Sequence, residues 1–310
     1  MELISKIIAI ALFIIVVAAV LLPVTNQLRT DDVETIDIIL IDGQSNGAYY
    51  PNNQIRCNPA IVNQNIGTPE HKAYYYGTAD GSSRVVGENT EIREMYVNGQ
   101  WVIGGEEPGL AYNLMKKNNR DVLVLNIARG GTGIKDLAVG SIWDASKNMI
   151  ETAVSEISTM YAAKNYVGWV MIHGEHDANN SVSYYEQYFN VLDGKLANLG
   201  FKECYIALPR YEQSYNAYIA MEDLANKEPD VHIATSITET FTVQNGLLYT
   251  DDVHYTQKGR LVLAEAVIDH IPADPNFGDK DMSNLIQVIP IIMFVAAILM
   301  AVRLMRKQDA

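Results

Sequence analysis

Cysteine and net positive charge are both scarce in this sequence. The only cysteines among the 310 residues are Cys57 and Cys204, so a disulfide framework is excluded, while the choice between one bridge and two separate thiols stays open. Lysine and arginine total 23 against 37 aspartates and glutamates, which gives a formal net charge of -14. A surface of this sign repels phosphate backbones. Nucleic acid is therefore not an expected partner.

Internal repeats and low-complexity tracts are also missing, but long apolar runs stand at both ends of the chain. Residues 7–24 and 285–302 hold no charged side chain. At about 1.5 Å per residue, each run approaches the roughly 30 Å hydrocarbon thickness of a bilayer. We expect a transmembrane anchor in residues 1–26 and a transmembrane helix in residues 285–303. A cleaved secretory signal and a core or amphipathic helix are the respective alternatives.

Basic residues flank the two apolar runs on the same side. Lys6 precedes the first run, and the basic tail of residues 304–310 follows the second. The positive-inside rule then places both termini in the cytoplasm. We expect residues 27–272 to form one domain outside the cell, on a cell surface or a viral envelope, with residues 273–284 as a linker. Whether the anchors also associate into a homo-oligomer stays open.

Strand-like and helix-like segments alternate between the apolar runs. The predicted strands are residues 35–41, 121–128, 166–173, 203–209 and 231–236. The predicted helices are residues 108–118, 145–164, 183–200, 217–227 and 256–271. Most of the strands are nearly continuous apolar runs, as expected where helices cover both faces of a sheet. The pattern predicts an α/β domain with a largely parallel five-stranded sheet.

Residues 48–104 break this alternation and are rich in Asn, Gly and Tyr. The Asn98-Gly99 pair suits the type I′ turn of a hairpin. We expect an insertion above the first strand, in which aromatic side chains either stack on sugar rings near a site or form a small satellite core. These side chains are Tyr49, Tyr50, Tyr74, Tyr75, Tyr76, Tyr96 and Trp101.

Polar clusters follow three of the predicted strands. They read DGQSNG at 42–47, ARGGTG at 128–133 and HGEHDA at 173–178, and a further polar group, TDDVHYTQKG, occupies 250–259 before the last helix. Each alone is explained by an ordinary turn. In open α/β sheets, however, ligands bind outside the carboxyl ends of the strands. The joint occurrence of these clusters therefore indicates a site.

Ser45, His254 and Asp251 fit the chemistry of acyl transfer. A serine hydroxyl needs a base to remove its proton, and an imidazole does this near neutral pH when a carboxylate fixes its tautomer. Asp251 stands three residues before His254, so a turn can fold the carboxylate towards Nδ1 and leave Nε2 free for Ser45. Asp252 is the rival carboxylate. The sequence therefore predicts Ser45 as nucleophile and His254 as base.

The negative charge that develops on the carbonyl oxygen during acyl transfer needs hydrogen-bond donors. The backbone N–H groups of Ser45 and Gly131 are the first candidates, because a glycine backbone can approach a substrate closely. A side chain of the 173–178 cluster is the third. The candidate oxyanion or substrate-binding residues are Gln44, Gly131, His173 and His176.

The four clusters together resemble those of the SGNH (GDSL-like) hydrolases, in the branch that holds sialate O-acetylesterases and the acetylxylan esterases of carbohydrate esterase family six. That branch carries G-Q-S-N, G-G-T-S-like, H-Q-G-E-S-D-A-like and D-G-x-H blocks. Here they read GQSN at 43–46, GGTG at 130–133, IHGEHDA at 172–178 and DDVH at 251–254. Order and rough spacing match over residues 35–270. The resemblance implies a flavodoxin-like three-layer α/β/α fold.

The resemblance also implies roles for individual residues. Ser45 falls on the family nucleophile, His254 on the base and Asp251 on its orienting acid. Glu175 falls on a family glutamate that can also assist the histidine.

Three positions depart from the family pattern. His173 stands where the family has Gln, His176 where it has Ser, and Gly133 where the glycine block ends in Ser. The third oxyanion donor is therefore in question, because His173 donates an N–H only in a suitable tautomer.

The resemblance implies a serine esterase that hydrolyses O-acetyl esters on carbohydrate without a cofactor, and the apolar runs add the expectation that it is membrane-anchored and acts outside the cell. No metal site is expected, because neighbouring residues such as His173 and His176 rarely converge on one ion. One alternative is a non-catalytic glycan-binding protein of a cell surface or virion, in which the altered 173–178 block has lost turnover. The other is an esterase for lipid acyl chains, against which the polar, tyrosine-rich insertion argues.

Overall fold

The computed structural model describes residues 34–48, 56–77 and 91–274 of the chain. Both predicted transmembrane segments, residues 1–26 and 285–303, lie outside the described residues. Within the described ranges, none of the helices combines the length and the apolar character that a bilayer crossing requires.

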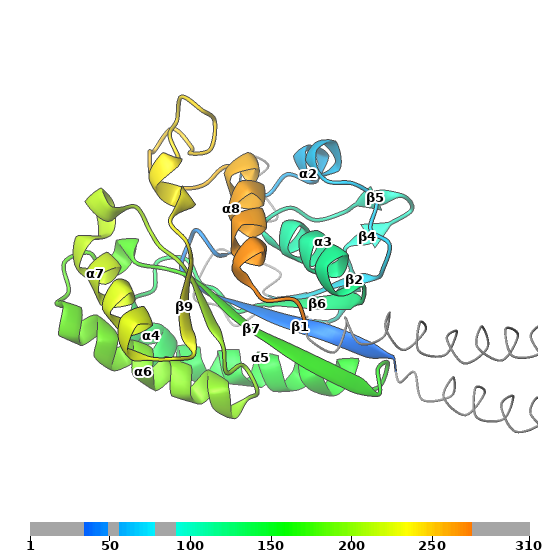
Figure 1. The fold of residues 1–310 in the computed structure, drawn as a ribbon, viewed down its shortest axis with the longest axis horizontal. Coiled ribbons are helices and arrows are strands. Elements are labelled where there is room, and N and C mark those ends of the chain that lie inside the picture. The colour runs from blue at the N-terminus through cyan, green and yellow to red at the C-terminus, as the bar shows by residue number, and fades with distance from the viewer. Residues whose placement is uncertain (1–33, 49–55, 78–90, 275–310) are drawn as a thin grey trace, which may run out of the picture.

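A seven-stranded sheet forms the centre of the domain (Figure 1). Its strands are β1 (Thr35–Gly43), β2 (Ala73–Gly77), β3 (Arg93–Glu94), β6 (Asp121–Asn126), β7 (Ala163–Ile172), β8 (Cys204–Ala207) and β9 (Val231–Thr235). Their order is β3-β2-β6-β1-β7-β8-β9. All neighbouring strands run parallel except β2 and β3, which are antiparallel.

The five predicted strands all belong to this sheet, as β1, β6, β7, β8 and β9. Taken by themselves they lie in the order second, first, third, fourth, fifth along the chain, which is the flavodoxin-like order. The predicted number of strands was wrong, because β2 and β3 extend the sheet to seven.

β2 lies where the sequence indicated an insertion. It pairs in parallel with β6 from Ala73 to Gly77. Tyr74, Tyr75 and Tyr76 are 3%, 6% and 2% exposed and pack into the cores on the two faces of the sheet. Tyrosines in a Gly- and Asn-rich stretch resemble surface residues, and the local sequence gives no sign of the partner strand, whose paired residues lie 49 positions later in the chain. These tyrosines therefore belong to the main core, and neither role expected for them applies.

The hairpin expected around Asn98-Gly99 is present. β4 (Tyr96–Val97) pairs with β5 (Gln100–Trp101), and the φ angles of Asn98 and Gly99 are 51° and 82°, both positive as a type I′ turn requires. The Trp101 ring is buried, meets the Tyr96 ring edge-on at 5.4 Å and donates its Nε1–H to the Gly67 carbonyl. Tyr49 and Tyr50 lie outside the described residues.

Helices cover both faces of the sheet (Figure 1). One layer holds α3 (Glu107–Asn118) and α8 (Gln257–His270), with the short α2 (Pro59–Asn65) beside them; the other holds α4 (Ile134–Ala138), α5 (Ser141–Ile157), α6 (Val182–Asn198) and α7 (Tyr211–Lys227). In β1, Ile36, Ile38 and Leu40 face the second layer, and Ile39 and Ile41 face the first. This burial on both sides explains why the strand reads as an unbroken apolar run. The arrangement is a three-layer α/β/α domain.

Two predicted helices have different boundaries in the structure. The segment predicted as residues 145–164 is α5, which ends at Ile157 because β7 begins at Ala163. α7 begins at Tyr211, earlier than predicted, and Ser214 interrupts it with non-helical angles (φ -145°, ψ 31°). That interruption disturbs the helical periodicity in the first turns of α7, so the sequence pattern begins only after it.

The two ends of the described domain lie together at the amino edge of the sheet. Arg120 forms an ion pair with Asp37 of β1 at 3.3 Å and a second with Asp274. The Asp274 N–H also donates to Oδ1 of Asn118 at 3.2 Å. The chain therefore enters and leaves the domain at neighbouring points.

Cys57 precedes α2 and Cys204 lies in β8, and both side chains are buried. The structure describes both residues and does not join them by a disulfide.

Candidate active site

The carboxyl ends of β1 and β7 lie side by side where the strand order reverses. β2 and β6 lie on one side of β1, and β7, β8 and β9 lie on the other. Gln44 directly follows β1, and its N–H donates to the Ile172 carbonyl at the end of β7, at 3.1 Å. Gly43 makes this close approach possible, because a Cβ there would lie 2.0 Å from the Ile172 oxygen. This is the position where open α/β sheets bind ligands, and Ser45 follows it at once.

Ser45, His254 and Asp251 are connected by hydrogen bonds. Nε2 of His254 lies 2.9 Å from Oγ of Ser45, and Nδ1 lies 2.8 Å from Oδ2 of Asp251. An ionised carboxylate only accepts, so Nδ1 carries the proton and Nε2 accepts from the serine hydroxyl. The arrangement can remove the proton from Ser45.

The Asp251 carboxylate is held from both sides. Oδ1 accepts the N–H groups of Val253 at 3.0 Å and His254 at 2.9 Å. Oδ2, which accepts from the His254 ring, also accepts from Nη2 of Arg56 at 3.2 Å. Partial burial acts to raise the pKa of Asp251, but the hydrogen bonds from His254 and Val253 outweigh it and lower that pKa to about 2. Asp251 is therefore ionised at neutral pH.

Asp252, the rival carboxylate, points elsewhere. Its Oδ1 pairs with Nη1 of Arg210 at 3.2 Å, and its side chain is 59% exposed. Its carbonyl accepts from Arg210 at 2.9 Å and from Nε2 of Gln213 at 2.7 Å. Asp252 also adopts the left-handed region at φ 57°, where a non-glycine residue needs such support. In this geometry Asp252 shapes the turn and Asp251 contacts the imidazole.

Glu175 contacts the nucleophile turn rather than the imidazole. It begins a short 3₁₀ helix, η1 (Glu175–Asp177), after β7. Its Oε1 accepts from Nδ2 of Asn46 at 2.7 Å, and its Oε2 accepts from Nε2 of Gln44. Burial raises the pKa of Glu175, and the two amide hydrogen bonds and the attraction of His254 oppose that rise. Glu175 therefore lies within electrostatic reach of His254, while its hydrogen bonds go to Gln44 and Asn46.

Gln44 and Asn46 join the three catalytic segments. Oε1 of Gln44 accepts the His176 N–H at 3.1 Å. Nδ2 of Asn46 donates to the Val253 carbonyl at 3.2 Å, and its Oδ1 accepts the Tyr255 N–H at 3.1 Å. Through these amide hydrogen bonds, the turn that contains Ser45 is connected both to η1 and to the segment that contains His254. Asn46 had no assigned role from the sequence, although it lies in the G-Q-S-N block.

His173 is buried beneath the glycine-rich loop. Its Nε2 lies 3.1 Å from the Thr132 carbonyl, and its Nδ1 lies 3.0 Å from the Tyr185 hydroxyl. A carbonyl only accepts, so Nε2–H donates to Thr132 and Nδ1 accepts from Tyr185. Burial lowers the pKa of His173 to about 4, against the opposing effect of Asp177. Both ring nitrogens are thus used within the protein, and the neutral ring holds the loop in place instead of offering a donor at Ser45.

Two of the departures from the family pattern lie against each other. The His176 side chain is exposed at the rim of the site. A Cβ added to Gly133 would lie 3.2 Å from Cδ2 of His176 and 3.1 Å from Oδ1 of Asp177. The larger side chain at 176 therefore occupies the room that a side chain at 133 requires.

Backbone donors for an oxyanion remain available. Within the described ranges, the N–H groups of Ser45 and Gly131 donate to no acceptor of the protein. Gly131 is exposed at φ +72°, and nothing lies within 4 Å of the position that a Cβ would take. A substrate can approach this backbone closely.

A buried ion pair supports the nucleophile turn from below, and sequence reasoning missed it. Nη1 of Arg260 contacts both carboxylate oxygens of Glu106 at 2.7 and 2.5 Å, and Nη2 donates to the Ser45 carbonyl at 3.2 Å. The neighbouring Glu107 accepts from Nδ2 of Asn126 at 2.7 Å, and that amide also donates to the Gly47 carbonyl at 2.8 Å. Isolated charged residues on amphipathic helices carry no pattern that marks them as buried.

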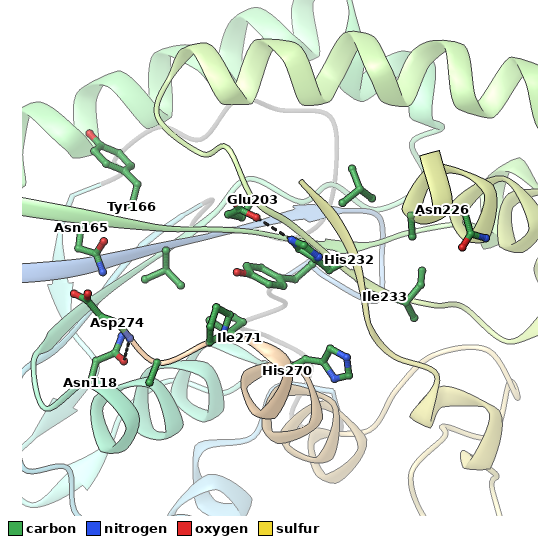
Figure 2. A pocket seen from close by; sticks show the side chains of 16 residues that line it. Asn118, Asn165, Tyr166, Glu203, Asn226, His232, Ile233, His270, Ile271 and Asp274 are labelled. Carbon is green, nitrogen blue, oxygen red and sulfur yellow. Dashed lines mark hydrogen bonds and ion pairs between the residues drawn. The ribbon is translucent and has the colours of Figure 1, made fainter. Parts of the chain in front are cut away.

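A cleft of about 920 Å³ lies at the amino edge of the sheet (Figure 2), and Ser45 is not among the residues that line it. Part of its polar lining is paired: Nε2 of His232 lies 2.8 Å from Glu203, and Asn118 and Asn165 both donate to Asp37. None of the predicted site residues lines this cleft. In the part of the chain that the structure describes, no cluster of His, Cys, Asp and Glu is arranged to hold a metal ion.

No family model and no curated protein sequence matches the chain. Among solved structures, it matches a protein from Arabidopsis thaliana at 17% identity, over 76% of this chain and 97% of that one, with a TM-score of 0.48. It matches a carbohydrate acetylesterase from Xanthomonas citri at 14% identity, over 55% of this chain and 40% of that one, with a TM-score of 0.37. It also matches a candidate SGNH hydrolase from Slackia heliotrinireducens at 10% identity, over 78% of this chain and all (100%) of that one, with a TM-score of 0.40. The descriptions of these proteins include the family that the sequence motifs resemble.

Proposed function

We propose that this chain is a serine esterase that removes O-acetyl groups from carbohydrate. The observation that carries the proposal is the relay in which Nε2 of His254 lies 2.9 Å from Ser45 and Nδ1 lies 2.8 Å from Asp251. A hydroxyl, an imidazole and an ionised carboxylate in this order are the parts that nucleophilic acyl transfer needs.

The first half of the reaction forms an acetyl-enzyme. Oγ of Ser45 attacks the acetyl carbonyl carbon while Nε2 of His254 takes the hydroxyl proton. The backbone N–H groups of Ser45 and Gly131 donate to the oxygen that becomes negative. His254 then returns the proton to the sugar oxygen, the ester bond breaks, and the alcohol leaves.

The second half releases acetate. His254 takes a proton from a water molecule, whose oxygen attacks the acetyl carbonyl. Collapse of the tetrahedral intermediate returns the proton to Oγ of Ser45. Asp251 stays ionised throughout and stabilises the imidazolium that forms in both halves.

Polar side chains around Ser45 favour a short acyl group on a polar alcohol. Gln44 and Asn46 flank Ser45 in the chain and bond to Glu175 and to the His176 N–H, whereas an acyl slot for a lipid chain would need apolar walls. The motif resemblance points to O-acetylated carbohydrate as the substrate class, and no step above calls for a cofactor.

We also infer that residues 1–26 and 285–303 tether the domain to one membrane face. The support is that Asp37 and Asp274 share Arg120, so the chain enters and leaves at the sheet edge opposite Ser45. The site would then face away from the bilayer, on the outer side if both termini are cytoplasmic. Protease protection of the C-terminal tail in intact cells tests this orientation, and digestion of that tail from outside would contradict it.

The esterase proposal is tested with the full chain in detergent micelles and 4-nitrophenyl acetate. Ser45→Ala and His254→Ala should each lower kcat/KM at least about a thousandfold. Ser183→Ala, at an exposed serine of α6, is the matched control and should retain full activity. Equal hydrolysis by wild type and Ser45→Ala would contradict the esterase proposal. Faster cleavage of the octanoyl ester than of the acetyl ester would contradict the preference for acetyl groups. Binding of acetylated glycan without turnover would instead support the non-catalytic alternative.

A further inference from the structure

Three tyrosines form a stripe on the outer face of α7. Tyr215 and Tyr218 are spaced at i and i+3 on one face of the helix, and Tyr211, which precedes the break at Ser214, joins them through its ring contacts. The Tyr211 ring meets the Tyr215 ring at 5.0 Å and the Tyr218 ring at 5.1 Å, both edge-on. Tyr211 and Tyr215 are 40% and 53% exposed, and within the described ranges they are the only aromatic side chains among the exposed large hydrophobic ones.

The core does not account for the two exposed tyrosines, Tyr211 and Tyr215. The buried residues of α7 are Ser214, Ala217, Ala220, Met221 and Leu224. These residues pack the helix against the sheet, and Tyr218 is partly buried against the same core, whereas Tyr211 and Tyr215 lie outside this contact. An aromatic face of this kind is costly to expose and commonly marks a binding surface.

The segment that leads into α7, together with its first turn, contacts both catalytic segments. Arg210 and Gln213 donate to the Asp252 carbonyl at 2.9 and 2.7 Å, beside the Asp251 that orients His254. On the other side, Pro209 packs so closely on Gly174 that a Cβ there would lie 2.6 Å from the proline ring. Gly174 directly precedes Glu175. The stripe therefore starts at the same edge of the sheet as Ser45.

We infer that the Tyr211, Tyr215 and Tyr218 stripe is a subsite that binds a neutral sugar ring of the acetylated glycan whose ester lies at Ser45. This inference rests on the proposed esterase function and adds where the rest of the substrate lies. Tyrosine offers a rigid, amphipathic ring on which the apolar C–H face of a sugar can pack, while hydroxyls at the ring edge bond to polar groups.

Carboxylates border the stripe and fit this ligand. Oε1 of Glu239 accepts the Tyr211 N–H, at 2.6 Å. Partial burial, and then the charges of Glu222 and Glu239, raise the pKa of Tyr218, so these carboxylates lie near the tyrosine rings. Carboxylates accept hydrogen bonds from sugar hydroxyls, and together with the net charge of -14 they repel an anionic polymer. A neutral oligosaccharide is therefore the expected occupant.

The test compares a short and a long substrate in the full chain. The short substrate is 4-nitrophenyl acetate, and the long ones are chemically acetylated hexasaccharides of β-1,4-linked xylose, glucose and N-acetylglucosamine. The variants are Tyr215→Leu, the double variant Tyr211→Leu/Tyr215→Leu, and Tyr215→Phe as the matched control that keeps the ring. Binding of the deacetylated hexasaccharides to Ser45→Ala, with and without the leucine changes, gives a readout that does not depend on turnover.

We expect the leucine variants to raise KM for at least one acetylated hexasaccharide about fivefold to tenfold, which corresponds to roughly 1 to 1.4 kcal/mol, with kcat and the hydrolysis of 4-nitrophenyl acetate unchanged. Tyr215→Phe should behave as wild type. An unchanged KM in the leucine variants would overturn the subsite and leave the esterase proposal intact. The same conclusion would follow if wild type hydrolysed 4-nitrophenyl acetate but neither bound nor cleaved any hexasaccharide. Loss of activity on both substrates in Tyr215→Leu would also overturn it, because the stripe would then act on the catalytic loop. Absence of all hydrolysis by wild type would refute the proposed function itself, and the binding readout would still decide the subsite.

Discussion

Arg56 and Asp251, 195 residues apart in the chain, form an ion pair at 3.2 Å on the same carboxylate oxygen that accepts from the His254 ring. Arg56 is 15% exposed and its guanidinium lies 5.8 Å from the centre of the Tyr249 ring. The loop behind it is fixed, since the Asn58 N–H donates to Gln257 at the start of α8. Arg56 therefore adds a positive charge beside the Asp251 carboxylate that orients His254.

Replacement of Arg56 should change the pH dependence of catalysis. A cation at Asp251 stabilises the carboxylate and opposes a second positive charge on the imidazole, so Arg56→Gln should move the acid limb of kcat/KM upward by about 0.5 to 1 pH unit. Arg56→Lys should keep most of the wild-type profile. Arg93→Gln, which removes an equally charged but exposed side chain, should leave it unchanged. A uniform loss of activity with an unmoved acid limb would show that Arg56 serves only to hold the loop.

The two adjacent aspartates of the D-D-V-H block should respond very differently to the same substitution. Asp251→Asn removes the charge that fixes the imidazole tautomer, so kcat should fall about a thousandfold to ten-thousandfold. Asp252→Asn leaves the carbonyl contacts to Arg210 and Gln213 in place, so kcat should change less than about threefold. Steady-state kinetics on 4-nitrophenyl acetate measure both, and comparable losses would contradict the assignment of Asp251.

Acidic pH should act on Asp251 in a defined direction. Its pKa is lowered from 3.8 to about 2 in the folded protein, so the stabilising effect of its ionised form is complete above pH 4 and is lost as the pH falls towards 2. Protonation of Asp251 therefore does not limit activity between pH 5 and 8, and an acid limb in that range must come from another group.

Glu107 should make the stability of the domain decrease as the pH rises. Burial and the adjacent Glu106 raise its pKa from 4.5 to about 8, so between these values the folded state holds a proton that the unfolded state has lost. Stability then falls with rising pH across this window. Glu107→Gln keeps a neutral side chain at every pH, so its free energy of unfolding should fall less between pH 5 and 8 than that of wild type, by at least about 1 kcal/mol.

Denaturant unfolding at several pH values measures this difference. Glu151→Gln, at a half-exposed carboxylate of α5, is the matched control and should leave the pH dependence as in wild type. Parallel pH curves for wild type and Glu107→Gln would show that Glu107 is ionised in the folded protein.

The parallel core of the sheet could be predicted because the central parts of its strands are nearly continuous apolar runs. β2 could not, because its pairing with β6 decides its burial, and a short tyrosine-rich segment between polar stretches looks the same in a surface loop. The start of α7 was predicted too late, at residue 217, because Ser214 interrupts the helix and its periodicity after the first turn.

In the candidate site, too, residues within local motifs could be predicted and residues that depend on distant partners could not. Ser45, His254 and Asp251 stand in compact blocks at strand or helix ends, where spacing alone indicates which side chains meet. Arg56 and Arg260 are single charged residues whose partners lie 195 and 154 residues away, so no local pattern connects them. His173 shows the opposite failure, since its place in a motif indicated a donor at the site and its burial uses both ring nitrogens elsewhere.

Removing only one partner of the buried pair of Arg260 and Glu106 should destabilise the domain more than removing both. Both side chains are almost completely buried, at 0% and 1% exposure. Arg260→Met leaves the Glu106 carboxylate without its partner, which should lower the free energy of unfolding by about 3 to 5 kcal/mol. The double variant Glu106→Leu/Arg260→Met leaves no buried charge behind, so it should be more stable than Arg260→Met alone.

Thermal and denaturant unfolding of the single and double variants measure these differences in the free energy of unfolding. The control is Lys147→Met, at an exposed ion pair with Glu151, which should lower the free energy of unfolding by less than about 0.5 kcal/mol. The double variant separates stability from catalysis, because it also removes the guanidinium that donates to the Ser45 carbonyl. If that donor positions the nucleophile turn, the double variant stays folded and loses kcat. A double variant that is no more stable than Arg260→Met would mean that Glu106 takes up a proton when its partner is removed, which a pH-dependent free energy of unfolding for Arg260→Met would reveal.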